Sequence, residues 1–241
     1  MTDMTELKLK LSVGLWEDMI MRVLITGTSS GIGKGIADKF LKEGYTVIGI
    51  DRREASIQHE CYTHICMDIR DKTQYPELAP FDIVVNNAGV QNEEDIDVNL
   101  KGTIAITETY GIHSSIHSVL MIGSASGHNG SEFPEYVASK GGILSYTKNV
   151  ALRIANYGAT CNSLDFGGVL TDLNLPVIED KALWNQIMEQ TPLKRWMTVE
   201  EAADWAYFIT VTNRFCTGQN ILIDGLEAGN AHFVWPEEPT V

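Results

Sequence analysis

The sequence has no long apolar run. None of its hydrophobic stretches approaches the roughly 18 consecutive apolar residues that a membrane-spanning helix needs. Its start, Met1–Glu6, lacks the basic residues and the apolar stretch of a secretory signal peptide. We therefore expect no membrane partner and, by elimination, a cytoplasmic protein.

Positive charge is also scarce. The 241 residues include 18 lysines and arginines against 32 aspartates and glutamates, which gives a formal net charge of −14. A surface this acidic repels the phosphates of nucleic acids and of anionic lipids. We expect no nucleic-acid partner, and the charge weighs against an anionic carrier protein or coenzyme A derivative as substrate.

Residues for covalent or metal cross-links are few. Cys66 and Cys161 fall within apolar runs, so we interpret the cysteines as buried reduced thiols. His113 and His117 are four residues apart and could bind a metal if helical, but no third ligand accompanies them, so we expect no metal. The four cysteines never form a CxxC pair: Cys61, Cys66, Cys161 and Cys216.

Short apolar runs alternate with helical patterns from Arg22 onward. This order predicts a parallel sheet with helices on both faces, and runs such as Val23–Ile25 fit strands that are covered from both sides. Neither a repeat nor a linker interrupts the pattern, so residues 21–241 are predicted to form one domain. The predicted strands are Arg22–Thr26, Thr46–Ile50, Thr63–Cys66, Phe81–Val85, Val119–Ile122, Thr160–Leu164 and Asn220–Ile223, and the clearest predicted helices span about residues 31–43, 95–110, 136–156, 179–190 and 199–210.

The first 20 residues stand apart from this pattern. Leucine or valine at alternate positions from Leu7 to Leu15 has the period of a strand. Met19 and Met21 lie just before the first predicted strand and offer a later start of translation. Residues 1–20 are thus either a leader or a real edge strand or arm, and both alternatives stay open.

A glycine-rich turn, Thr26–Gly33, follows the first predicted strand and opens a helix. Glycines let the backbone turn tightly and approach a pyrophosphate without a Cβ clash. The helix start presents unpaired N–H groups and a partial positive charge to the phosphates. Because a strand precedes this turn and a helix follows it, the segment predicts a dinucleotide site.

Asp51 ends the second predicted strand, about 20 residues beyond the glycines. A carboxylate there would accept hydrogen bonds from the adenosine ribose and repel the extra phosphate of NADP. Ser30, before the second glycine, supplies no cation for that phosphate. Arg52 and Arg53 could pair with it, although a solvated pair of loop residues is the simpler interpretation. We therefore expect NAD as the cofactor, with NADP less favoured.

Several motifs in order resemble the short-chain dehydrogenase/reductase family over about residues 22–226. The glycine turn matches the TGxxxGxG motif, Asn86–Gly89 the NNAG motif, and Tyr136 with Lys140 the YxxxK pair. The resemblance implies a single-domain Rossmann-type α/β fold, a doubly wound parallel sheet of about seven strands. It implies cofactor contacts at Gly27, Ser29, Ser30, Gly31, Ile32, Gly33, Asp51, Arg52, Asp68, Ile69, Asn87, Ala88, Gly89, Tyr136, Lys140, Gly167, Val169 and Thr171.

The resemblance assigns catalysis to Ser124, Tyr136, Lys140 and Asn99. Tyr136 and Lys140 share one face of a predicted helix. A tyrosine with a pKa of about 10 is a poor base at neutral pH, but a nearby ammonium favours the phenolate. Tyr136 would then act as general base in oxidation and general acid in reduction. Ser124 would donate a hydrogen bond to the substrate oxygen, with Ser126 as the alternative, and Asn99 would hold a water on the proton path.

The sequence departs from the family pattern in three places. Phe166 precedes Gly167 where the family usually has proline, and Leu226 stands where a second glycine is common. The stretch from Gly89 to Asn99 is short, which should open one wall of the cleft or change a helix used for subunit pairing. Asp165 could contact substrate, but a loop or helix-cap carboxylate is the simpler interpretation.

Residues 172–197 are predicted to form a substrate lid. Trp184 and Ile187 are spaced for one helix face, which fits an apolar lid over a hydrophobic ketone or secondary alcohol. Ordinary packing of a short helix onto the domain is an equal alternative. Charge disfavours sugar phosphates, whereas polyols remain open as substrates.

We expect an oxidoreductase that transfers a hydride between NAD(H) and a small-molecule secondary alcohol or ketone. One alternative is an NADPH-linked 3-oxoacyl reductase, and another is a non-catalytic protein that senses NAD(H). The family also implies a homotetramer or homodimer built from helices 95–110 and 136–156.

Overall fold

A computed structural model describes residues 21–131 and 133–229. The possible leader, residues 1–20, and the acidic, proline-rich tail around residues 235–239 lie outside the described residues. The centre of the fold is a seven-stranded parallel sheet in the order β3-β2-β1-β4-β5-β6-β7. The strands are β1 (Arg22–Thr26), β2 (Thr46–Asp51), β3 (Tyr62–Cys66), β4 (Ile83–Asn86), β5 (Ser118–Ile122), β6 (Thr160–Phe166) and β7 (Asn220–Ile223).

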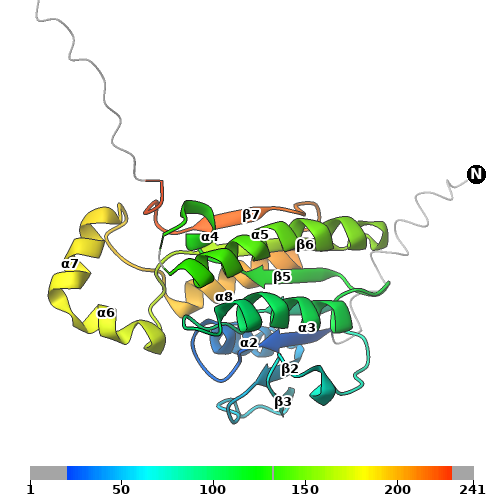
Figure 1. The fold of residues 1–241 in the computed structure, drawn as a ribbon. Helices are drawn as coiled ribbons and strands as arrows, with labels where there is room; N and C mark the ends of the chain where they lie inside the picture. The colour runs from blue at the N-terminus through cyan, green and yellow to red at the C-terminus, as the bar shows by residue number, and fades with distance from the viewer. Residues whose placement is uncertain (1–20, 132, 230–241) are drawn as a thin grey trace, which may run out of the picture.

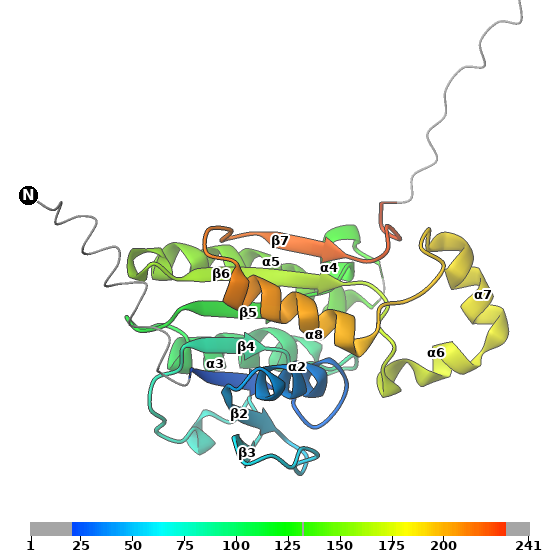
Figure 2. The same ribbon diagram turned by 180° about the vertical axis from the view of Figure 1, so that it is seen from behind.

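Helices cover both faces of the sheet, so the predicted fold class is confirmed. One face carries α3 (Thr103–Tyr110) and α5 (Pro134–Ile154), in front of the strands in Figure 1. The other face carries α2 (Gly31–Lys42) and α8 (Val199–Tyr207), which come to the front in Figure 2. The shorter helices are α4 (Ser126–Asn129), α6 (Leu175–Glu179) and α7 (Lys181–Gln190).

Local signals explain where several helices begin and end. Gly44, just after α2, has a φ of +88°, a backbone conformation that favours glycine and ends the helix. Helix α8 begins with a capping box in which Thr198 and Glu201 each satisfy the other's backbone N–H. Asp180 accepts hydrogen bonds from two backbone N–H groups at the start of α7. The predicted helix 179–190 is therefore present but begins at Lys181, and Glu179 belongs to the separate short helix α6.

The predicted helix 95–110 begins as a π-helical segment, Ile96–Gly102, and only then continues as α3. A second π-helical segment, Phe208–Thr212, extends α8. Such wide turns are common at functional sites. The apolar spacing of the sequence did not predict them.

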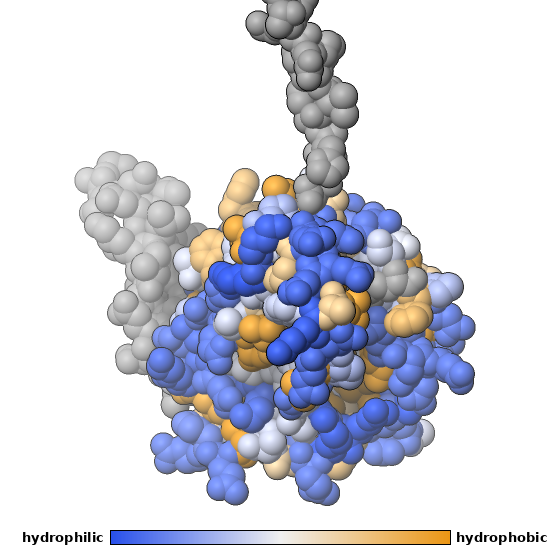
Figure 3. Space-filling view, turned by 90° about the vertical axis from the view of Figure 1, so that its left-hand side faces the viewer, coloured by the Kyte–Doolittle hydropathy of each residue, from blue (hydrophilic) through white to orange (hydrophobic). Residues whose placement is uncertain are grey.

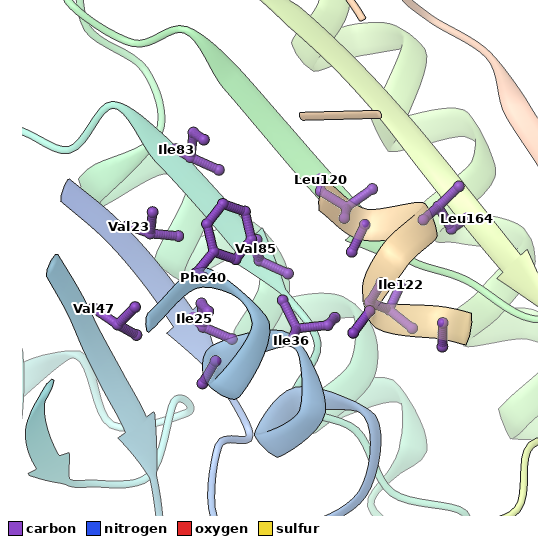
Figure 4. Packing of buried hydrophobic residues seen from close by; sticks show 14 of the residues in the cluster. Val23, Ile25, Ile36, Phe40, Val47, Ile83, Val85, Leu120, Ile122 and Leu164 are labelled. Atoms are coloured by element: carbon purple, nitrogen blue, oxygen red, sulfur yellow. The ribbon is translucent and has the colours of Figure 1, made fainter. Parts of the chain in front are cut away.

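Apolar side chains of α2 fill the layer between this helix and the sheet. Figure 4 shows Ile36 and Phe40 pointing toward Val23, Ile25 and Val85 of the central strands. All five side chains are fully buried. This packing fixes the start of α2 relative to the end of β1, where the glycine-rich turn lies.

Cys66 is exposed and Cys61 and Cys216 are only partly buried, so the prediction of buried thiols is wrong at these three positions. Strand β3 is the edge strand of the sheet beyond β2, and the edge leaves one of its faces open. Cys161 is fully buried in β6, as predicted, and burial raises the pKa of its thiol. His113 and His117 lie in the segment before β5 and not on a helix, so the spacing argument for a metal does not apply to them.

All strands are parallel, so their carboxyl ends meet at one edge of the sheet. Helices α6 and α7 project beyond that edge (Figures 1 and 2). None of the helices in the described part of the chain combines the length and the hydropathy that a membrane span requires.

Phe40→Ala should lower the free energy of unfolding by about 3–5 kcal/mol, because it empties a fully buried site. The ring centroid of Phe40 lies 5.2 Å from that of Tyr45 and 5.5 Å from that of Tyr207, so aromatic contacts are lost as well. Urea titration followed by circular dichroism measures the change. Phe215→Ala is the matched control, since Phe215 is 96% exposed. A loss below about 1 kcal/mol for Phe40→Ala would contradict this packing.

Candidate active site

A cavity of about 1090 Å³ opens at the carboxyl ends of the strands, where open parallel sheets bind their ligands. Figure 3 faces this end of the molecule and shows apolar residues among mostly hydrophilic ones. Of the residues singled out from the sequence, three do not line the cavity: Ser29, Gly33 and Asn99. The others do: Gly27, Ser30, Gly31, Ile32, Asp51, Arg52, Asp68, Ile69, Asn87, Ala88, Gly89, Ser124, Tyr136, Lys140, Gly167, Val169 and Thr171.

The turn after β1 depends on close backbone approach. A Cβ on Gly33 would lie 2.2 Å from the carbonyl oxygen of Gly27, and a Cβ on Gly27 would lie 2.6 Å from Nδ2 of Asn87. That Asn87 amide donates to the carbonyls of Thr26 and Gly27. Because these glycines lack a Cβ, the start of α2 can lie directly against the end of β1. Gly31 and Ile32, the first residues of the helix, line the cavity, and a helix start suits a pyrophosphate.

Asp51 is a buried carboxylate at the end of β2. Its oxygens accept hydrogen bonds from the backbone N–H groups of Ser29 and Arg53, both at 2.9 Å. Burial raises the pKa of Asp51, but these hydrogen bonds and the guanidinium of Arg53 lower it, and the net shift is downward. The group is thus a carboxylate at neutral pH, in the position expected for ribose recognition.

Arg53 also donates from Nη2 to the hydroxyl of Ser30 at 2.6 Å. The expectation that no cation stands near Ser30 is therefore wrong. Residue type at position 30 gave no sign of this contact, because the guanidinium reaches it from a residue 23 positions away.

Asp68 lines the part of the cavity beyond β3, and Arg70 holds its carboxylate in place. The side-chain hydrogen bonds from Arg70 lower the pKa of Asp68 more than burial raises it. Arg70 and Arg52 both pair with Glu94, from the short segment after β4. The sequence predicted the position of Asp68 but not its arginine partner.

The structure brings Ser124, Tyr136 and Lys140 together. Ser124 follows β5 and is 7% exposed, and its hydroxyl lies 3.0 Å from that of Ser126. Nζ of Lys140 lies 5.6 Å from the centroid of the Tyr136 ring and donates to the carbonyl of Ile122 at 3.0 Å. Both Ser124 and Ser126 line the cavity, so either hydroxyl can reach a ligand there.

Asn99 lies behind the cavity, in the π-helical segment. Its amide oxygen accepts from the backbone N–H of Val90, and its Nδ2 donates to the Val90 carbonyl. Nδ2 is also within hydrogen-bond distance of Asp95 and of the hydroxyl of Ser139 on α5. These hydrogen bonds hold the short stretch before Asn99 against its side chain. Neither Asp95 nor Ser139 was singled out from the sequence.

The structure places Asp165 and Phe166 at the end of β6, and Asp165 differs from expectation. Asp165 is fully buried within β6 and does not line the cavity, so it is neither a substrate contact nor a helix cap. Its carboxylate accepts a hydrogen bond from His128, 37 positions away, a distance at which no local pattern predicts contact. Phe166 packs into the core on the α2 and α8 face and also borders the cavity.

The far end of the cavity contains residues that sequence reasoning missed. Trp196 is buried beside Gly168, and its ring stands edge-on to that of Trp184 on α7, with centroids 5.0 Å apart. No residue of α6 or α7 is fully buried. Other lining residues that were not singled out include apolar ones such as Met67 and Val90, and the polar residues Asn129, Ser131, Asn174, Gln190, Asp224 and Glu227.

A model of the family described as short chain dehydrogenase matches residues 21–182. The chain belongs to the short-chain dehydrogenase/reductase family. It is therefore an oxidoreductase whose hydride carrier is NAD or NADP, and the glycine turn with its close backbone contacts fits such a dinucleotide.

Similar proteins share the fold along nearly their whole length. A 3-oxoacyl-[acyl-carrier-protein] reductase of Buchnera aphidicola is 27% identical over 83% of this chain and 94% of its own length. A D-beta-hydroxybutyrate dehydrogenase of Rhizobium meliloti is 28% identical over 86% of this chain and 98% of its own length. A solved structure of 4-hydroxyisoleucine dehydrogenase with NADH superposes with a TM-score of 0.81 at 24% identity, over 88% of this chain and all of that one.

Gly33→Ala should weaken NADH binding at least about tenfold and destabilise the fold, because its Cβ would overlap the Gly27 carbonyl. Tryptophan-to-NADH energy transfer measures binding, and thermal unfolding measures stability. Gly141→Ala is the matched control: this helical glycine has nothing within 4 Å of a built Cβ, so the change should be neutral or stabilising. Equal NADH affinity in both variants would contradict the close approach at the turn.

Proposed function

We propose that this chain is an NAD(H)-dependent dehydrogenase or reductase that interconverts a secondary alcohol and a ketone. The observation that carries the proposal is the placement of a buried ammonium, Lys140, against the ring of Tyr136, with Ser124 lining the same cavity. These three groups are what proton transfer and oxygen stabilisation at one carbon centre require.

The residues divide the work as follows. The ammonium of Lys140 favours the phenolate form of Tyr136, which then takes the hydroxyl proton of the substrate in oxidation and returns it in reduction. The hydroxyl of Ser124 donates a hydrogen bond to the oxygen as negative charge develops there. The nicotinamide, when bound, supplies or accepts the hydride. Asn99 is held by hydrogen bonds to the backbone of Val90, a residue that lines the cavity, and is proposed to support the proton path from Lys140.

Asp51 supports NAD over NADP. Three N–H donors from Ser29 and Arg53 bind its carboxylate, which keeps one further lone-pair position for a ribose hydroxyl. The same charge opposes a 2′-phosphate.

A second candidate is an NADPH-linked 3-oxoacyl reductase, the activity named for the Buchnera relative. The guanidinium of Arg53 on Ser30 favours it, since this cation stands at the turn. The net charge of −14 opposes an acidic carrier protein as partner. We therefore rank this candidate second, and a purely NAD(H)-sensing role third.

The segment 172–197 is proposed as the lid. Leu173 is 69% exposed and borders the cavity, while α6 and α7 bury no residue completely. Exposed apolar side chains beside a cavity gain burial when a ligand brings them together. Polar residues such as Gln190 and Asn174 also line the cavity. We propose a substrate with an apolar body and at least one further polar group.

We also propose how copies of this chain associate. Helix α5 exposes Leu152 to 81%, which supports the proposal that α3 and α5 pair two copies in a homodimer or homotetramer. The cytoplasmic location stays a prediction from the sequence.

Tyr136→Phe should lower turnover by about 10²–10⁴-fold, because the proton donor and acceptor is removed. A panel of secondary alcohols with NAD, and of ketones with NADH, measures turnover by absorbance. NADH affinity should change by less than about threefold, since the ring stays. Tyr157→Phe, on a partly exposed tyrosine after α5, is the control and should keep the wild-type rate. A Tyr136→Phe protein that kept most of its rate would refute the assigned role.

Asp51→Ala should shift the ratio of NADPH to NADH affinity toward NADPH by about tenfold, because the repelling carboxylate is gone and Arg53 remains. Fluorescence titrations with each cofactor measure the ratio without any substrate. Asp38→Ala, on the exposed face of α2, should leave it unchanged. An unchanged ratio for Asp51→Ala would remove the basis for choosing NAD.

A further inference from the structure

A fully buried carboxylate lies directly behind the catalytic group. Asp165 is 0% exposed, and its neighbours in β6, Leu164 and Phe166, point into the α2 and α8 layer. Asp165 therefore points to the opposite face, where Oδ2 accepts a hydrogen bond of 2.6 Å from Nε2 of His128 on α4. Carboxylates are almost never fully buried unless they are paired. Hydrophobic packing alone therefore does not account for this carboxylate, and its pairing with His128 needs an explanation.

The pair touches the turn that carries Ser124. Oδ1 of Asp165 lies so close to Gly123 that a Cβ there would be 1.8 Å away. The backbone N–H groups on either side of Ser124 donate to the carbonyls on either side of Asp165: Gly123 to Leu164 and Ala125 to Phe166, both at 2.9 Å. Helix α4 begins just after Ser124. The hydrogen bond from His128 on this helix therefore ties the segment that follows Ser124 to Asp165 as well.

Lys140 is the second charged group that faces this carboxylate. Its Nζ is bound to the carbonyl of Ile122, and Ile122 is paired with Leu164 in the sheet. Burial raises the pKa of Asp165, while the hydrogen bond from His128 and the charges of His128 and Lys140 lower it; the net direction is upward. The charged groups around the carboxylate are thus His128 from α4 and Lys140 from α5.

We propose that His128 and Asp165 form a positioning pair that fixes the Ser124 turn on β6 and sets the local charge that Lys140 and Tyr136 experience. The inference rests on the proposed dehydrogenase function and adds two residues to it. The pair touches neither substrate nor cofactor and acts through Lys140 and the turn.

The side chain of His128 is 28% exposed, so solvent reaches the pair from the α4 side. With an imidazolium the pair is neutral, and with a neutral imidazole it carries one negative charge. A negative charge near Lys140 favours the protonated form of Lys140 but disfavours the phenolate form of Tyr136. The pair therefore links the ionisation of Tyr136 to the charge on two residues outside the cavity.

Direct titration of Tyr136 tests this link without substrate or cofactor. The ultraviolet absorbance of ionised tyrosine is followed against pH, and the curve of the corresponding Tyr136→Phe protein is subtracted in each background. Asp165→Asn removes one negative charge and should move the Tyr136 midpoint to lower pH by about half a unit to one unit. His128→Lys supplies a cation at every relevant pH and should move it in the same direction.

The chain offers a matched control at the opposite end of the sheet. His117 and Asp82 form a second histidine–carboxylate contact, with Nδ1 and Oδ1 3.6 Å apart, before β4 and β5. Asp82→Asn and His117→Lys should leave the Tyr136 midpoint within about 0.2 units of wild type.

Three results would overturn the proposal: an unmoved midpoint in Asp165→Asn, an unmoved midpoint in His128→Lys, or an equal shift in the control pair. If Asp165→Asn fails to fold, His128→Lys decides alone, since its site is partly exposed. Shifted midpoints in a protein whose Tyr136→Phe variant keeps its turnover would refute the proposed function and leave the electrostatic link standing. Unmoved midpoints with a dead Tyr136→Phe variant would refute this inference alone.

Discussion

The hydrogen bond from the ammonium of Lys140 to the carbonyl of Ile122 holds the site together. It ties helix α5, which carries Tyr136 and Lys140, to the end of β5, from which Ser124 follows. Burying an ammonium costs free energy unless its hydrogen bonds are satisfied. The hydrogen bond to the Ile122 carbonyl therefore fixes the position of the ammonium. Position and charge at the proposed centre thus depend on one side chain that is 6% exposed.

Close approach of backbone segments shapes the rest of the cavity. Glycines at the β1–α2 turn let the helix start approach the strand end, and Asn87 fastens the two together. One departure from the family pattern has a local cost: Leu226 has a φ of +70°, a left-handed conformation that costs about 1 kcal/mol without glycine. The carboxylate of Asp224 accepts the backbone N–H of Leu226 and helps to hold it there.

Much of the fold was predictable because its signals are local. The strands were found from short apolar runs, and the turn at Gly27–Gly33 from glycine spacing between a strand and a helix. Seven of seven predicted strands in the described part of the chain are present, although the fourth begins at Ile83 and not at Phe81. Phe81 is nevertheless fully buried, so the apolar run marked the core and not the strand boundary.

What the sequence did not predict depends on contacts between distant segments. The exposure of Cys66 follows from the order of strands in the sheet, and no local pattern reveals that order. The contact between His128 and Asp165 and the arginine on Ser30 join residues that only the fold brings together. The candidate catalytic residues were named from motifs, whereas the residues that support them were not.

A crystal structure with NADH bound would show the proposed site directly. We expect the adenosine ribose on the carboxylate of Asp51, the pyrophosphate on the N–H groups after Gly31, and the nicotinamide beside Tyr136 and Lys140. The hydroxyls of Ser124 and Tyr136 should then converge on one point next to that ring. A dinucleotide bound elsewhere, or a Tyr136 hydroxyl directed away from the nicotinamide, would contradict the account.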